Sequence, residues 1–137
     1  MKRIFALSTV VLMLCAAMTT TSCVSVSKAF EENGYDMTEL TPAQQGGLAS
    51  FLSAFPAYGQ VSKGHLVKGN TIVFVFDEDA QAWENYCYSL TNAGFSKMAT
   101  GYVRADKSAG KTYNVASSVT EVLGKQLRLI TFSAVAF

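Results

Sequence analysis

The sequence has few of the residues on which catalytic and metal sites depend. Its 137 residues include one His, three Cys and two Pro, and charged residues make up 15% of the chain. The formal net charge of +1 argues against nucleic-acid binding, because neutralising phosphates requires a basic surface. The length fits one domain. An apolar content of 50% excludes an intrinsically disordered chain, which has low hydrophobicity and high net charge.

Motifs that mark known catalytic sites are also absent. The sequence contains no P-loop, no Gly-x-Gly-x-x-Gly fingerprint and no Gly-x-Ser-x-Gly elbow. A single His argues against a zinc site. We therefore predict no catalytic residue, no metal and no cofactor. An enzyme with Cys87 as nucleophile and His65 as base is the least favoured alternative, because Cys87 falls on the apolar stripe of a predicted helix.

The amino-terminal segment has the architecture of a signal peptide. Lys2 and Arg3 precede a mostly apolar run over residues 4–18, and small residues lead from there to Cys23. The run is shorter than the roughly 20 residues of a membrane-spanning helix. We therefore predict a cleaved signal peptide over residues 1–22. A transmembrane anchor is the less favoured interpretation, because no basic stop-transfer flank follows the run.

The residues at the end of this segment carry a family resemblance. Thr20-Thr21-Ser22-Cys23 resembles the lipobox of bacterial lipoproteins, although Leu is more common than Thr at its first position. The resemblance implies that signal peptidase II cleaves between Ser22 and Cys23. It also implies that Cys23 carries a diacylglyceryl thioether and an acylated amine, a covalent lipid that anchors the chain in a membrane. The alternative is a conventional signal peptide, in which Cys15 and Cys23 have no role.

The residue after Cys23 bears on the location of the protein. In bacterial lipoproteins an Asp at this position tends to retain the protein in the inner membrane, and this chain has Val24 there. The resemblance thus implies a lipid-anchored protein of the cell envelope, in the outer membrane and facing the periplasm. Cleavage would leave Cys87 as the one free thiol, so no intramolecular disulfide is predicted.

The mature chain divides into a linker and a domain. Residues 23–40 mix Ser and Gly with acidic side chains, and we predict that they form a lipidated tether with one short helical turn. Residues 41–137 are predicted to form a single domain. Its first helix begins at Thr41-Pro42, with Thr as the N-cap, and Pro56 ends it. The apolar side chains at helical spacing between these points are Leu48, Phe51, Leu52 and Phe55.

Two strands and a second helix come next. Residues 60–67 and 71–76 are predicted strands around a tight turn. The second strand is apolar throughout, which predicts burial on both faces and thus requires a second packing element or a dimer. Acidic residues at positions 77–79 provide an N-cap and first-turn acids for a helix that ends at Gly94.

Three strands complete the predicted domain, over residues 95–105, 111–122 and 126–135. Their alternation of apolar and polar side chains predicts an antiparallel meander. The order helix, two strands, helix, three strands indicates the α+β class. It predicts one mainly antiparallel sheet with the helices packed on one face. A spaced pattern over residues 70–132 resembles small uncharacterised α+β lipoprotein domains and implies a fold but no activity. This pattern is Tyr86-x-x-x-Leu90-x-x-x-Gly94-Phe95, then Tyr102, then Tyr113-x-Val115.

These features favour a membrane-anchored, non-catalytic module. Its expected role is structural or protein-binding, with another envelope protein or a second copy as the partner. The alternative is a lipoprotein that binds a small ligand or a glycan. Tyr35, Tyr58 and Tyr102 are the aromatic residues that we expect to be exposed, and they form the candidate interface.

Overall fold

The structure is a computed structural model, and it describes residues 25–137. The predicted signal peptide and its cleavage site between Ser22 and Cys23 lie outside the described residues. The elements in chain order are α2 (Val26–Glu31), α3 (Pro42–Gly46), the 3₁₀ helix η1 (Ser50–Ala54), β1 (Gly64–Lys68), β2 (Thr71–Asp77), α4 (Ala80–Asn92), β3 (Ser96–Met98), β4 (Gly101–Asp106), β5 (Lys111–Val122) and β6 (Lys125–Ala136).

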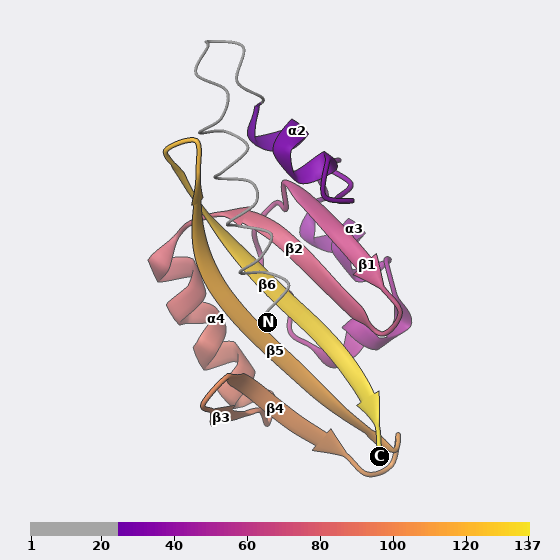
Figure 1. Cartoon of the computed structure of the whole chain (residues 1–137). Helices are drawn as coiled ribbons and strands as arrows, with labels where there is room; N and C mark the ends of the chain where they lie inside the picture. Colours follow the sequence, from indigo (N-terminus) through magenta and orange to yellow (C-terminus); the bar gives the residue numbers. More distant parts are fainter. Residues whose placement is uncertain (1–24) are drawn as a thin grey trace.

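All six strands form one antiparallel sheet, in the order β1-β2-β6-β5-β4-β3 (Figure 1). β5 and β6 are the longest strands, with 12 residues each. A two-residue turn at Leu123-Gly124 joins them, and both turn residues have a positive φ, as this type of hairpin turn requires. The predicted α+β class with one mainly antiparallel sheet is therefore confirmed.

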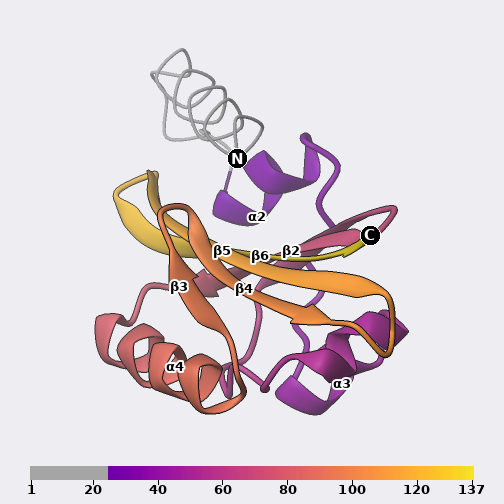
Figure 2. The same ribbon diagram turned by 90° about the horizontal axis from the view of Figure 1, so that it is seen from below.

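The larger core lies between the sheet and α3, η1 and α4, which share one face (Figure 2). We call this side the helix face. Aromatic rings dominate its packing: the Phe55 ring lies 5.5, 5.6 and 5.0 Å from the rings of Phe95, Tyr113 and Phe132. The buried residues of this core are Leu52, Phe55, Tyr58, Ile72, Phe74, Phe76, Tyr86, Leu90, Phe95, Tyr113, Val115, Ile130, Phe132 and Ala134.

β2 is buried on both faces, as its unbroken apolar sequence predicts. Phe74 and Phe76 point toward the helix face, whereas Val73 and Val75 belong to a second buried cluster on the opposite face. We call this opposite side the open face. The element that covers Val73 and Val75 is α2, which lies across the sheet from α3 and α4 (Figure 2). The second packing element is therefore within the same chain.

The position of α2 corrects two predictions. The helices lie on both faces of the sheet and not on one. The segment predicted to be a tether, residues 23–40, is part of the domain from Ser25 onward, because Ala29 and Phe30 are 0% and 1% exposed. The edge of the Phe30 ring packs on Tyr35 at 5.1 Å between ring centres. A helix of six residues is too short for its periodicity to be recognised, and packing rather than propensity stabilises it.

The chain after α2 covers the outer edge of β1. Asp36 and His65 form an isolated antiparallel bridge, with both N–H to carbonyl distances at 2.9 Å. Leu40 and Ser62 form a second bridge at 3.1 and 2.9 Å. The β1 edge is therefore not open to another strand along this segment.

Two predicted elements are divided in the structure. The helix expected from Thr41 to Pro56 breaks after Gly46 into α3 and the 3₁₀ helix η1, because consecutive glycines are poor helix formers. The strand predicted over residues 95–105 is a hairpin, in which Ser96 of β3 lies opposite Val103 of β4. Four strands therefore follow α4 in place of the three expected.

Several local predictions are confirmed. β5 has the predicted bounds, and the acidic stretch 77–79 supplies the N-cap of α4: the Asp79 carboxylate accepts a hydrogen bond from the backbone N–H of Ala82. The first-turn acids expected from the same stretch are not found, because Asp77 and Glu78 precede the cap and the first turn of α4 contains no acidic residue. The helix stops at Gly94, which has a φ of +92°. The backbone N–H of Phe95 then donates to the carbonyl of Leu90 at 3.0 Å and closes the end of the helix.

Candidate functional site

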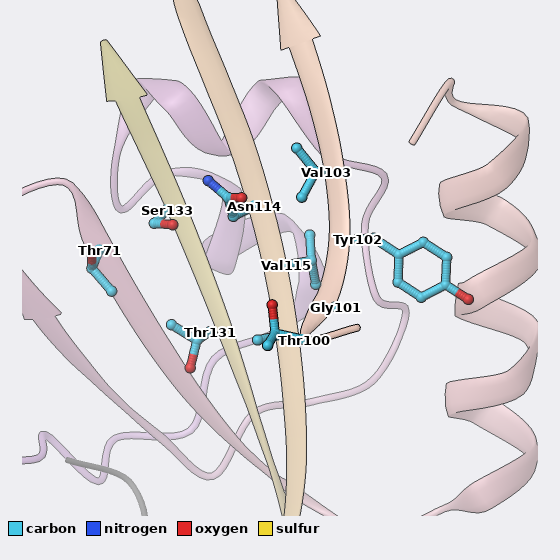
Figure 3. A pocket seen from close by; sticks show the side chains of 10 residues that line it. Thr71, Thr100, Gly101, Tyr102, Val103, Asn114, Val115, Thr131 and Ser133 are labelled. Atoms are coloured by element: carbon cyan, nitrogen blue, oxygen red, sulfur yellow. The ribbon is translucent and has the colours of Figure 1, made fainter. Parts of the chain in front are cut away.

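The part of the open face that α2 leaves uncovered forms a shallow groove of about 290 Å³, which we call the open-face groove. Its residues come mainly from β4, β5 and β6 (Figure 3). None of the described residues that line it is Asp, Glu, Lys, Arg or His, so the polar side chains they contribute are hydroxyls and amides. The lining consists of Thr71, Thr100, Gly101, Tyr102, Val103, Asn114, Val115, Ala116, Thr131 and Ser133.

Strand register sets polar side chains of the groove in a row. Ser133 of β6 lies between Thr71 of β2 and Asn114 of β5. Beside this row, Thr131 Oγ1 is shielded from solvent and has no hydrogen-bond partner within residues 25–137, and the same holds for Ser118 Oγ on the same face of β5. A buried hydroxyl without a partner costs about 1–3 kcal/mol.

Gly101 fixes the end of the groove. Its φ is +151°, and a Cβ atom built there would lie 2.1 Å from the carbonyl oxygen of Val115. Only glycine satisfies both the backbone conformation and the close approach of the two strands. β4 begins at this residue, so β5 continues beyond it without β4 at its side.

Within residues 25–137, this continuation of β5 has a neighbouring strand on one side only. β4 pairs with β5 as far as Val115, and within the described part of the chain residues 117–122 pair with β6 alone. We call the backbone groups of Ser117, Val119 and Glu121 on the side of β5 away from β6 the free β5 edge. The tight hairpin directs the backbone groups of Ser117, Val119 and Glu121 away from β6. Val119 is 45% exposed there, so this edge offers both hydrogen-bonding groups and an apolar side chain.

An ion pair on the helix face supports this part of the hairpin. Arg128 of β6 lies opposite Val119, and its Nε and Nη2 donate to the two carboxylate oxygens of Glu78 at 2.8 and 2.7 Å. Its Nη1 donates to Ser117 Oγ at 2.6 Å, and the guanidinium lies 5.0 Å from the centre of the Trp83 ring. The Arg128 and Glu78 side chains are 9% and 17% exposed, so the pair is largely shielded from water.

Glu78→Gln is expected to lower the free energy of unfolding by about 2–3 kcal/mol, because Arg128 then keeps its charge in a shielded site without a counter-charge. Chemical denaturation of the full chain measures this difference. Glu84→Gln is the matched control, since Glu84 is exposed on α4 and its loss should change stability by no more than about 0.5 kcal/mol. Equal effects of the two variants would contradict a stabilising role for the ion pair.

The structure does not bring Cys87 and His65 together. His65 lies in β1, where its nearest carboxylate oxygen is Asp36 Oδ2 at 3.9 Å. Cys87 lies on α4, and a hydrogen bond joins its side chain to the Tyr102 hydroxyl of β4. This hydrogen bond raises the pKa of Tyr102 to about 12, and burial of the hydroxyl contributes to the same shift. Three strands separate β1 from β4, which corresponds to about 19 Å at the usual strand spacing. The Cys–His dyad is therefore not assembled.

The three tyrosines of the predicted interface do not form a common surface. Tyr35 is buried in the cluster beneath α2, and Tyr58 is buried on the helix face against Phe76 at 4.5 Å. Burial raises the pKa of each of these two hydroxyls to about 12. Tyr102 is half-buried, and its ring points away from the other groove residues toward a helix (Figure 3). The expectation that Tyr35 and Tyr58 are exposed is wrong, because both complete the packing of short irregular segments.

A second hollow, of about 230 Å³, lies on the helix face between α3, η1 and the sheet. We call it the helix-side pocket. Its lining is mostly apolar and aromatic, and among residues 25–137 no Asp, Glu, Lys, Arg or His contributes to it. The lining residues are Pro42, Gln45, Gly46, Leu52, Ser53, Phe55, Pro56, Ala57, Tyr58, Phe74 and Phe132. Sequence patterns did not indicate this pocket, because it results from the break between α3 and η1.

Within residues 25–137, no three His, Cys, Asp or Glu side chains converge as metal ligands. None of the helices in that range is long and apolar enough to cross a membrane. The chain matches no protein-family model, no curated protein and no solved structure.

Proposed function

We propose that this protein is a lipid-anchored protein of the bacterial cell envelope whose domain binds another protein and catalyses no reaction. The resemblance of residues 20–23 to a lipobox supports the anchor, with cleavage between Ser22 and Cys23 and lipid on Cys23. Val24 favours the outer membrane and an orientation toward the periplasm.

The position of α2 adds a constraint on this anchor. α2 begins at Val26, three residues after Cys23, and an extended chain of three residues spans at most about 11 Å. Because α2 is packed on the sheet, a lipid on Cys23 would hold the domain directly at the membrane surface. The open face, where α2 lies, would be the face next to the anchor.

The free β5 edge is the observation that supports protein binding. An extended segment of a partner can add to such an edge through backbone hydrogen bonds, while side-chain contacts give specificity. Of the two outer strands of the sheet, β1 is bridged by Asp36, and β3 has only three residues, fewer than the part of β5 that runs beyond β4. The open-face groove adjoins this edge at Ala116 and offers uncharged polar groups to the same partner.

A photo-crosslinking residue tests this binding mode in the intact envelope. Placed at Glu121 on the free β5 edge, it is expected to give a crosslinked product with a distinct protein, and Val119→Lys in the same chain should reduce that product about tenfold or more. Val119 carries the exposed apolar side chain of the edge, and Lys disfavours strand addition.

Position Val135 provides the control for this experiment. Val135 is 48% exposed, close to the 45% of Val119, but it lies at the far end of β6. A crosslinker at Val135 should not give the product that is expected at Glu121. Val135→Lys, combined with the crosslinker at Glu121, should not reduce that product as Val119→Lys does. Equal products at Glu121 and Val135, or a product that survives Val119→Lys, would contradict binding at the edge. A product with twice the mass of the chain would identify a second copy as the partner.

Binding of a small ligand is the second candidate function, and the helix-side pocket favours it. An apolar pocket between helices and a sheet is a common location for small-molecule sites. The open-face groove favours a glycan less, because the one aromatic side chain in its lining, Tyr102, points away from the other groove residues (Figure 3).

A further inference from the structure

We infer that the helix-side pocket is a binding site for a small, uncharged aromatic compound. The inference rests on the second candidate function and is independent of the lipid anchor and of the free β5 edge, which lie elsewhere on the fold. Its basis is the combination of a preformed wall, a floor of aromatic rings and the absence of charge in the lining.

Hydrogen bonds hold the walls of the pocket in place. The side-chain amide of Gln45, a buried residue in α3, donates to the carbonyl oxygens of Leu40 and Gln60 at 3.2 and 2.7 Å. On the other side, the Tyr86 hydroxyl of α4 donates to the carbonyl oxygen of Pro56 at 2.7 Å. Both walls are thereby tied to distant parts of the chain. The pocket is therefore formed without a ligand, which lowers the cost of binding.

The floor of the pocket defines the shape of the ligand. Phe132 and Phe74 come from adjacent strands, with ring centres 5.8 Å apart, and Phe55 meets Phe132 edge-on at 5.0 Å. Phe55, Phe74 and Phe132 are 8%, 2% and 4% exposed, so a ligand ring meets only the parts of these rings that line the pocket, in the edge-on or offset contacts that aromatic pairs prefer. An aliphatic ligand would fill the space without this directional contact.

Size and charge restrict the ligand further. An apolar cavity of about 150 Å³ accommodates benzene, whereas pockets for drug-sized ligands measure about 300–1,000 Å³. A volume of about 230 Å³ therefore fits one ring or two fused rings. A charged ligand would lose its hydration without meeting an opposite charge, because no charged side chain of the described part of the chain lines the pocket. Indole meets all of these requirements and serves as the probe.

The experiment is a titration of the ¹⁵N-labelled full chain with indole, followed by nuclear magnetic resonance in detergent micelles. Saturable shifts are expected in the backbone amide signals of residues 52–55, 57 and 58. The double variant Gly46→Leu/Ala57→Leu narrows the rim of the pocket from two sides. It is expected to weaken indole binding about tenfold or more. Gly46 tolerates the new side chain, because a Cβ atom built there meets no atom within 4 Å.

The matched control is Gly47→Leu/Ala43→Leu, which makes the same two changes at exposed positions outside the pocket lining. The affinity of this control variant for indole should stay within about twofold of the affinity of the unmodified chain. The control also corrects for indole that partitions into the micelles. The inference would be overturned by non-saturable shifts, by shifts confined to the open-face groove, or by equal affinities of the two double variants. Loss of indole binding would leave the crosslinking result at the β5 edge unaffected, so the two proposals fail separately.

Discussion

Phe30→Ala is expected to lower the free energy of unfolding of this protein by about 3–5 kcal/mol. The Phe30 ring is 1% exposed between α2 and the sheet, and its removal leaves a cavity over Val73 and Val75 of β2. The loss is large because folding stabilities are typically about 5–15 kcal/mol. Chemical denaturation of the full chain, with unchanged dependence on denaturant concentration, gives this value directly.

Glu31→Ala is the control for this measurement. Glu31 is the next residue of the same helix, and it is exposed. Its replacement should change the free energy of unfolding by no more than about 0.5 kcal/mol. If Phe30→Ala had an equally small effect, α2 would be a loosely attached segment, and the tether predicted over residues 23–40 would be the better description.

The fold could be predicted from the sequence wherever a local pattern is strong. The unbroken apolar run of β2, the presence of an N-cap within residues 77–79 and the helix stop at Gly94 each depend on neighbouring residues alone. The alternation in β5 and β6 likewise gave their antiparallel pairing and nearly all of their bounds. These patterns predict element type well because the interactions that produce them are short-range in the chain.

The remaining parts of the fold depend on contacts between distant residues. α2 is too short to show a helical periodicity in the sequence. Its buried residues can be recognised only from their packing on Val73 and Val75 of β2. The hairpin of β3 and β4 depends on the close approach of Gly101 to Val115, and no pattern in the neighbouring sequence indicates this contact. Tyr58 was expected to be exposed because it lies in an irregular segment, although it packs among core rings.

The candidate sites share this limitation. The free β5 edge exists because β4 begins only at Gly101 while β5 extends to Val122, a mismatch that is visible only in the register of the sheet. The helix-side pocket requires the break after Gly46 and two strand residues from far along the chain, Phe74 and Phe132. The pair Gly46-Gly47 within the predicted helix is the one sequence signal that could have indicated the helix break beside this pocket.

The second large effect concerns the anchor on which the proposed function depends. Cys23→Ser is expected to abolish attachment of lipid and to release the chain from the membrane fraction, because serine provides no thiol for a thioether. Each buried methylene of an acyl chain contributes about 0.8 kcal/mol to membrane binding, so loss of the acyl chains removes the anchor completely. Cys87→Ser is the control, since Cys87 lies within the domain and hydrogen-bonds to Tyr102.

Incorporation of radiolabelled palmitate into the chain tests the central claim most directly. The proposed lipoprotein incorporates label in its unmodified form and as Cys87→Ser, and it incorporates none as Cys23→Ser. Label retained by Cys23→Ser, or no label in the unmodified chain, would contradict the assignment of this protein as a lipid-anchored component of the cell envelope.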